Sequence, residues 1–274
     1  MKRLAALFIV LLLVAGCPQE EPRYEYSVDS LSIEGRDHIF SENYKIYVKL
    51  SENSFTPNNT LVLFQGRTRI IEYPLSEGAP EGNQLVFGWT AVTLGEHQLS
   101  AAIHGINDTQ VSEPKSLNIT VEPRGFYDFE SEELNHPVET GVWCAQRFEL
   151  ETSVPVSEIQ LHLRSLVLTP KNTHVLLELR EPSNGLPGAG EESLVKTLSI
   201  PSTEVKSHPG WYSFALGEEV PAGQYWFVLK RDSSVGNIAW TYANGENADG
   251  AYCRDSTISD EWFPMDGSFA FKIQ

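Results

Sequence analysis

The sequence has 274 residues, of which 41% are hydrophobic and 11% aromatic, enough apolar material for two modest domains with buried cores. It holds 20 Lys and Arg against 37 Asp and Glu, a formal net charge of −17. An acidic chain without a run of Lys or Arg has no surface that neutralises phosphate groups, so nucleic acid is excluded as an expected partner.

The first 16 residues have the organisation of a secretory signal. Lys2 and Arg3 give a positive start, residues 4–15 form an apolar run, and Gly16 precedes Cys17. At about 1.5 Å per residue the run spans about 18 Å, short of the roughly 30 Å of a bilayer core, so a transmembrane anchor is the weaker interpretation. Residues 14–17, Val-Ala-Gly-Cys, resemble the lipobox of prokaryotic lipoproteins, which implies cleavage before Cys17 and lipidation of its sulfur. An ordinary signal peptide with an incidental cysteine is the alternative.

These features predict an exported protein that is lipid-anchored to the envelope of a bacterium or archaeon. Loss of residues 1–16 removes Lys2 and Arg3, so the formal charge changes from −17 to −19. Residues 17–25 are then the lipidated Cys17 and a short tether, because residues 18–23 contain two prolines and no apolar face. The membrane is the expected partner at this end, reached through the lipid.

Residues 26–123 alternate short apolar runs with turn-forming residues. Ile46, Val48 and Leu50, for example, alternate with more polar neighbours, which predicts a strand with one face in a core. The seven predicted strands cover residues 28–33, 45–50, 61–64, 69–72, 84–89, 96–104 and 116–121. Their number and spacing predict an immunoglobulin-like β-sandwich. Residues 92–101, 112–114 and 118–121 resemble the last two strands of Ig-like, cell-adhesion-related modules of prokaryotic surface proteins, which serve as spacers or adhesive units.

Residues 124–140 break this pattern and are rich in acids, so we predict an acidic linker. Residues 141–274 then contain nine more strand candidates with no 3.6-residue periodicity, which predicts a second, jelly-roll sandwich and an all-β chain. The nine candidates cover residues 144–151, 158–166, 174–181, 194–200, 211–216, 223–230, 237–242, 251–254 and 268–273.

A set of short motifs occurs in order along this second half. It comprises residues 146–148 (Gln-Arg-Phe), 183–188 (Ser-Asn-Gly-Leu-Pro-Gly), 211–214, 220–226, 250–252, Trp262 and 269–273. Together they resemble the jelly-roll domains of secreted bacterial and archaeal surface proteins that are often named choice-of-anchor domains. Those domains are similar in architecture to carbohydrate-binding modules, and the resemblance implies no particular ligand.

The two cysteines of the second half are the only thiols left after lipidation of Cys17. We predict that Cys144 and Cys253 form a disulfide, which would close a loop of about 110 residues and stabilise the fold by roughly 4–5 kcal/mol. The alternative is two free buried thiols in strands that never meet.

Two further groups of residues are candidates for ligand binding. Asn244, Glu246, Asn247 and Asp249 carry the oxygen ligands that calcium takes, although a solvated hairpin loop explains the same residues. Sugar rings dock on exposed aromatic faces, and the four aromatic candidates for a glycan platform are Trp143, Trp240, Tyr242 and Trp262. Packing in the core is the alternative for each of these rings.

The sequence contains no nucleophile elbow, dinucleotide-binding loop, Walker loop or helical pair of zinc-binding histidines, so we expect no enzymatic activity and no required cofactor. The favoured hypothesis is an envelope lipoprotein whose distal jelly roll binds a polysaccharide or a surface protein in adhesion. A purely structural or assembly component of an envelope complex is the alternative, and a glycan-active enzyme is third. Asn58, Asn107 and Asn118 match the N-glycosylation pattern, which matters only if the host modifies asparagine.

Overall fold

The structure is a computed structural model that describes residues 25–35, 37–126, 134–167, 173–232, 237–243 and 250–274. In these ranges the chain is built from strands, and its helical segments are 3₁₀ turns of three residues. The turns cover Glu52–Ser54, Leu75–Glu77, Glu81–Asn83, Ile106–Asp108, Glu191–Ser193 and Ser202–Glu204. None of these described helices has the length and apolar character needed to span a membrane. The predicted all-β class is confirmed.

The chain divides into two compact units. The first contains residues 47–86, residues 98–117 and the described residues before 33, and the second contains residues 33–46, residues 87–97 and the described residues from 118 onward. The β-sheets do not follow this division into units. The strands of each described sheet come either all from residues 26–122 or all from residues 124–273. The domain limits expected from the sequence therefore remain predictions.

Residues 26–122 form two sheets. The four-stranded sheet has the order β6 (Gln84–Thr90), β3 (Asn43–Leu50), β1 (Tyr26–Ile33) and β8 (Ser112–Glu113). The five-stranded sheet has the order β2 (His38–Ile39), β9 (Lys115–Glu122), β7 (Gly95–His104), β4 (Thr60–Gln65) and β5 (Thr68–Pro74). Ile46, Val48 and Leu50 are fully buried and Lys45 and Lys49 are exposed, so the alternation predicted for β3 is confirmed.

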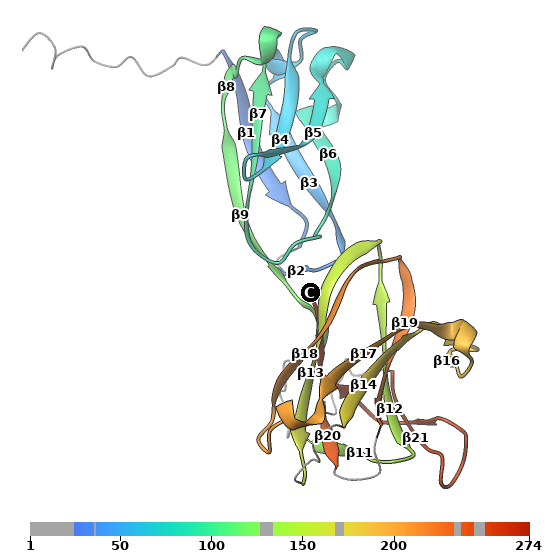
Figure 1. The fold of residues 1–274 in the computed structure, drawn as a ribbon. Coiled ribbons are helices and arrows are strands. Elements are labelled where there is room, and N and C mark those ends of the chain that lie inside the picture. The colour runs from blue at the N-terminus through green and yellow to red at the C-terminus, as the bar shows by residue number, and fades with distance from the viewer. Residues whose placement is uncertain (1–24, 36, 127–133, 168–172, 233–236, 244–249) are drawn as a thin grey trace, which may run out of the picture. The chain divides into compact units, whose positions relative to one another are not determined.

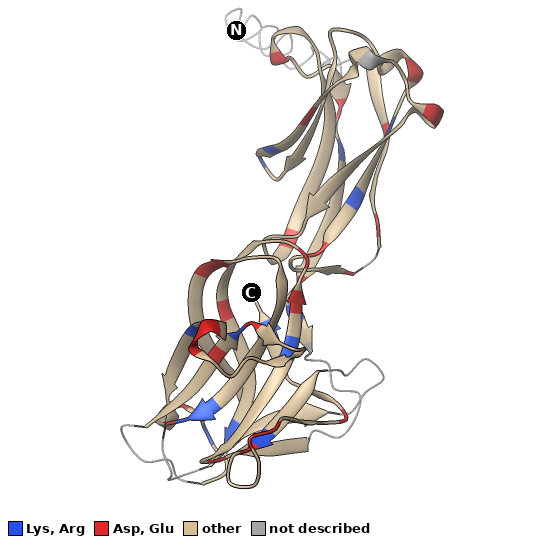
Figure 2. Cartoon of the chain, turned by 90° about the vertical axis from the view of Figure 1, so that its right-hand side faces the viewer, with Lys and Arg blue, Asp and Glu red and all other residues tan. Residues whose placement is uncertain are grey.

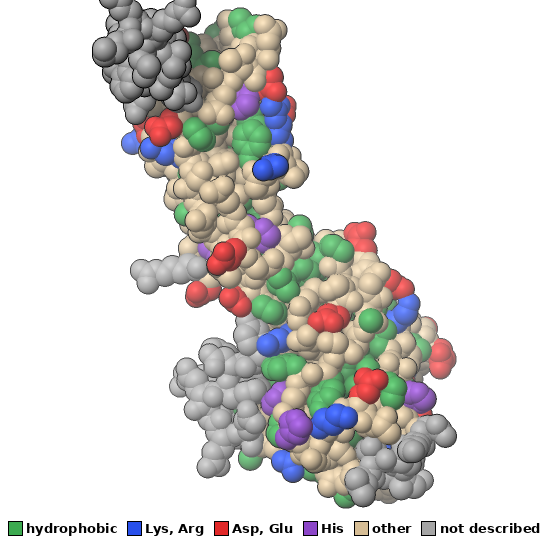
Figure 3. All heavy atoms as spheres, turned by 60° about the vertical axis from the view of Figure 1, so that its left-hand side comes forward, with side chains coloured by type: hydrophobic (Ala, Val, Ile, Leu, Met, Phe, Trp, Pro, Cys, Tyr) green, Lys and Arg blue, Asp and Glu red, His purple; other side chains and the backbone are tan. Residues whose placement is uncertain are grey.

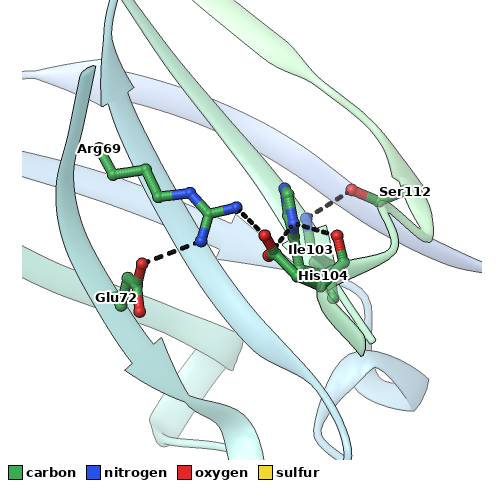
Figure 4. Close-up of polar contacts among 6 residues, drawn as sticks. Arg69, Glu72, Ile103, His104 and Ser112 are labelled. Carbon is green, nitrogen blue, oxygen red and sulfur yellow. Dashed lines mark hydrogen bonds and ion pairs between the residues drawn. The ribbon is translucent and has the colours of Figure 1, made fainter. Parts of the chain in front are cut away.

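A polar cluster holds the turn after β7 (Figure 4). Arg69 forms ion pairs with Glu72, at 3.1 Å, and with Asp108, whose carboxylate also accepts a hydrogen bond from His104 Nδ1 at 2.8 Å. The Ser112 hydroxyl accepts a hydrogen bond from the Ile103 amide at 2.8 Å. Arg69 and then His104 hold the pKa of the Asp108 carboxyl below its usual value. The φ of Asp108 is 61°, which is a left-handed backbone conformation. The contacts of its carboxylate with Arg69 and His104 hold the turn in this conformation.

Residues 124–273 form two larger sheets, which appear as facing layers in Figure 1. The six-stranded sheet has the order β17 (Leu194–Pro201), β14 (His174–Arg180), β19 (Gly223–Arg231), β12 (Val142–Leu150), β21 (Ala251–Asp255) and β22 (Phe263–Pro264). The seven-stranded sheet has the order β10 (Arg124–Phe126), β24 (Phe271–Ile273), β13 (Val154–Ser165), β20 (Ile238–Ala243) and β11 (Leu134–Val138), with β18 (Gly210–Val220) on β13 and β23 (Ser268–Phe269) on β20. A short hairpin adds β15 (Pro182–Ser183) and β16 (Leu186–Pro187).

Aromatic packing fixes which face of the six-stranded sheet is internal. Phe148 on β12 stacks on Phe227 of β19 at 4.1 Å and lies 6.3 Å from Phe271 of the opposite sheet. Because side chains alternate along a strand, Cys144 and Gln146 share the inward side of β12 with Phe148. Trp143, two positions before Ala145, therefore belongs to the outward side.

The segment predicted as an acidic linker differs from that expectation. Residues 124–126 form β10, which pairs with β24, and residues 134–138 form β11, which pairs with β20. Both segments therefore belong to the seven-stranded sheet. Each is short, and the acidic run between them falls in residues 127–133, outside the described residues.

Candidate ligand-binding face of the six-stranded sheet

Two of the four aromatic residues expected at a glycan platform are buried. Trp240 is 0% exposed and Tyr242 is 7% exposed, so the prediction that they lie at the surface is wrong. Trp240 stacks on Phe269 at 4.5 Å, and its indole Nε1–H donates to the Ala270 carbonyl at 2.8 Å. An indole with its face stacked and its only donor satisfied inside the sandwich offers nothing to a sugar.

The other two candidates lie on the outward side of the six-stranded sheet. Trp143 and Trp262 are half-buried and, together with half-buried Tyr252, pack on a small buried apolar group. That group consists of Ala145, Trp226 and Val228. The Tyr252 ring meets the Trp226 ring edge-on at 5.3 Å. Three partly exposed rings are thus held in fixed positions on one face of the sheet.

Two cations flank Trp143 because of the strand register. Arg254 on β21 is directly opposite Trp143, and pairing of Cys144 with Leu229 places Lys230 of β19 on the other side. Lys230 Nζ lies 3.9 Å from the centre of the Trp143 ring and the Arg254 guanidinium carbon lies 4.8 Å from it. Both contacts are cation–π interactions, which hold the two cations over the indole. We call Trp143, Lys230, Tyr252, Arg254 and Trp262 the Trp143 cluster.

The cations of this face are paired with two acidic side chains, Glu178 and Asp260. Glu178 Oε2 accepts hydrogen bonds from Lys230 Nζ and from Arg180 Nε, each at 2.6 Å, and these three side chains are 8–13% exposed. Burial lowers the pKa of Lys230, and the contact with Glu178 opposes that change. Arg254 is paired with Asp260. Figure 2 shows the Lys and Arg positions on the strands of this part of the chain.

A buried donor at the centre of the face lacks a partner. Trp226 is 0% exposed, and its indole Nε1 has no hydrogen-bond partner among the described residues. A buried donor without an acceptor costs about 1–3 kcal/mol, so an indole in this state is an unusual feature of a packed face. Trp226 belongs to the buried group on which Trp143, Tyr252 and Trp262 of the Trp143 cluster pack.

A second cation–aromatic group lies on the seven-stranded sheet. Trp211 of β18 is opposite His162 of β13, with ring centres 5.0 Å apart, and Lys272 Nζ lies 4.3 Å from the Trp211 ring. Figure 3 shows His, Lys and Arg side chains among hydrophobic ones on one face of this sandwich. Trp211 is half-buried, as Trp143 is, but no cluster of further exposed rings surrounds it among the described contacts.

The remaining site predictions have separate outcomes. Cys144 and Cys253 are directly opposite each other on β12 and β21, and both are free in the structure with their Sγ atoms 2.8 Å apart. The expectation of strands that never meet is therefore excluded, while the disulfide stays a prediction. The calcium candidates Asn244, Glu246, Asn247 and Asp249 lie outside the described residues, as does Cys17.

Sequence reasoning missed Lys230, Arg254 and His136. The two cations lie beside Trp143 only through cross-strand register, which a single sequence does not contain. His136 lies in the segment predicted as a linker, yet its Nδ1 is 3.4 Å from Cys144 Sγ and 3.7 Å from Cys253 Sγ. No local signal in the sequence points to either group.

Comparisons with known proteins find similarity among solved structures alone. No protein-family model matches the sequence, and no curated protein matches it. A carbohydrate-binding module of the β-sandwich superfamily, studied for promiscuous specificity, is 10% identical with a TM-score of 0.26, over 80% of this chain and 97% of that one.

Two larger bacterial proteins are also similar. A Corynebacterium diphtheriae protein described as membrane-anchored is 9% identical, with a TM-score of 0.32, over 91% of this chain and 59% of that one. Dimeric latent PorU from Porphyromonas gingivalis is 14% identical, with a TM-score of 0.25, over 82% of this chain and 20% of that one. This chain thus spans only part of the length of these two proteins.

Proposed function

We propose that this chain is a non-enzymatic lipoprotein of a cell envelope whose C-terminal sandwich binds a glycan through the Trp143 cluster. The observation that carries the proposal is the grouping of three half-buried rings and two cations on the outward side of one sheet. Rings that keep an exposed part can stack on the apolar face of a sugar, and Lys and Arg donate hydrogen bonds to its oxygens.

The roles within the cluster differ. The ring of Trp143 is occupied by Lys230 and Arg254, so Trp143 acts by positioning these donors rather than by stacking on the sugar. Trp262 and Tyr252 are the stacking surface, because both are half-buried and pack on the outward side of the sheet. This division makes Trp262 the most informative side chain to remove.

The test is binding of the full chain to an array of immobilised polysaccharides, followed by affinity measurement on the best ligand. Trp262→Ala is expected to weaken binding about tenfold or more, which corresponds to about 1.4 kcal/mol or more. Trp211→Ala is the matched control, because it removes a half-buried, cation-contacted Trp from the other sheet. A silent array, or an equal loss in Trp211→Ala, would contradict the proposal.

A second candidate function is that of a structural component in an envelope complex. It is favoured by two exposed apolar side chains in the segment from the end of β21 to β22, Ile258 (81% exposed) and Phe263 (47% exposed). Under this hypothesis these two side chains contact protein, so the array is silent while Ile258→Asp and Phe263→Asp abolish self-association or assembly of the full chain in sedimentation experiments.

A further inference from the structure

The interior of the C-terminal sandwich contains a thiol pair next to an imidazole. Cys144 and Cys253 face each other across neighbouring strands, and His136 reaches them from β11 of the opposite sheet. The Cys144 and Cys253 sulfurs are 2.8 Å apart, and His136 Nδ1 is 3.4 Å and 3.7 Å from them. An edge-on contact with Phe269 at 6.1 Å holds the imidazole ring in this orientation.

We propose that Cys253, Cys144 and His136 form a thiol–disulfide exchange site that reacts stoichiometrically with an external disulfide, with Cys253 as the attacking sulfur and Cys144 as the resolving one. This proposal is independent of glycan binding. It uses the geometry of three side chains on the inward side of the sheets, whereas the Trp143 cluster lies on the outward side.

Burial distinguishes the two sulfurs. Cys144 is 0% exposed, whereas Cys253 is half-buried on a strand near the edge of its sheet. An external disulfide can therefore meet Cys253 first, and Cys144 can attack only after that. Bonded sulfurs lie about 2.05 Å apart, so closing the protein disulfide shortens the present separation by only about 0.75 Å.

The pKa values of the two thiols also differ, and Cys253 has the lower one. Burial raises the pKa of Cys253, but hydrogen bonds with Cys144 and His136 and the charge of His136 outweigh it and bring that pKa to about 7. Burial raises the pKa of Cys144 well above its usual value. The contact with Cys253 raises the pKa of His136 against the effect of its burial. Among the described residues, Tyr242 also interacts with Cys253, and because burial raises the pKa of Tyr242 it is neutral at pH 7.

The reaction balances as a two-electron oxidation of the protein. Cys253 transfers its proton to His136, and its thiolate attacks one sulfur of the external disulfide, whose other sulfur leaves as a thiolate and takes that proton back from His136. Cys144 then loses its proton to the neutral His136, and its sulfur attacks Cys253 in the mixed disulfide. The bond between Cys253 and the external sulfur breaks, and this second thiolate takes the proton from His136, so one disulfide and two protein thiols give one protein disulfide and two external thiols.

The test uses reduced full-length chain carrying Cys17→Ala, so that only the two thiols of the site remain, with glutathione disulfide as the probe. Cys144→Ser is expected to accumulate one glutathione on Cys253, detected by intact mass and peptide mapping. Cys253→Ser is expected to react at least 100-fold more slowly. The parent chain is expected to release two glutathione thiols and retain no adduct.

The role of His136 has its own readout. The alkylation rate of Cys253 against pH is expected to show a midpoint near 7, which His136→Asn moves upward by about one unit or more, while His162→Asn leaves it in place. This profile is read on Cys144→Ser and on the parent chain, so a variant that fails to fold does not decide the matter. Equal reactivity of the two cysteines, a midpoint near the ordinary thiol value of about 8.5, or no adduct on Cys144→Ser would overturn the proposal.

Discussion

At the scale of single residues, burial decides what each aromatic side chain can do. Trp240 and Tyr242 lie on β20, a strand on which every residue is buried. The alternation of side chains along a strand shows that Trp240 and Tyr242 share a face. Because both faces of β20 are buried, the sequence pattern does not reveal that this shared face is covered by the rest of the sandwich. Trp143 is also part of an alternating strand, and only the contact of Phe148 with Phe271 shows that its side faces outward.

Glu178 is the carboxylate that two cations of the outward face, Arg180 and Lys230, share. Replacing it with Gln leaves Arg180 and Lys230, both largely buried, without their shared carboxylate. Uncompensated buried charges are costly, so Glu178→Gln is expected to lower the free energy of unfolding by about 3 kcal/mol. Urea unfolding followed by far-UV circular dichroism measures this as a lower midpoint with an unchanged m-value.

Glu218→Gln is the matched control for that measurement. Glu218 pairs with Lys196 at the surface, where the two side chains are 52% and 39% exposed. An ion pair in water contributes little, so this variant is expected to stay within about 0.5 kcal/mol of the parent chain. Equal effects of the two substitutions would show that the Glu178 network does not stabilise the outward face.

At the scale of elements, strand β10 depends on a glycine. A Cβ atom at Gly125 would lie 2.1 Å from the Phe271 carbonyl oxygen of β24, its partner strand. Gly125→Ala must therefore push β10 away from β24, and we expect a loss of about 1–3 kcal/mol. Hydrogen exchange of the Phe271 and Ile273 amides measures the loosening directly.

Gly88→Ala provides the comparison for this substitution. Gly88 lies in β6, and a Cβ atom there would meet nothing within 4 Å. It is expected to leave stability within about 0.5 kcal/mol of the parent chain and to leave exchange at β24 unchanged. If Gly125→Ala behaves in the same way, the close approach of β10 to β24 does not persist in solution.

Most strands could be predicted from the sequence because alternation is a local property. The expected strands at 45–50 and 158–166 correspond to β3 (Asn43–Leu50) and β13 (Val154–Ser165). β10 and β11 could not be predicted, because their three and five residues are specified by pairing with β24 and β20, far along the chain. The same limit applies to the Trp143 cluster and to His136, which register and sheet packing bring together.

At the scale of the whole molecule, net charge opposes any direct attraction to an anionic membrane. The chain carries −17 and, without residues 1–16, −19. Like charges repel, so this charge gives the chain no attraction to an anionic leaflet. If the chain is held at a membrane, as we propose, the lipid expected on Cys17 must supply the attachment, because buried acyl chain contributes about 0.8 kcal/mol per methylene.

Cys17→Ser tests this attachment in the intact cell. The parent chain is expected to incorporate labelled fatty acid and to enter the detergent phase on phase partitioning, whereas Cys17→Ser is expected to carry no label and to enter the aqueous phase. Cys144→Ser is the matched control, because it removes a buried thiol and leaves Cys17 available for acylation. An unlabelled parent chain, or a Cys17→Ser variant that stays in the detergent phase, would contradict lipid anchoring. Because like charges repel, a body with 19 excess negative charges is not expected to bind an anionic leaflet by electrostatic attraction once the lipid is absent.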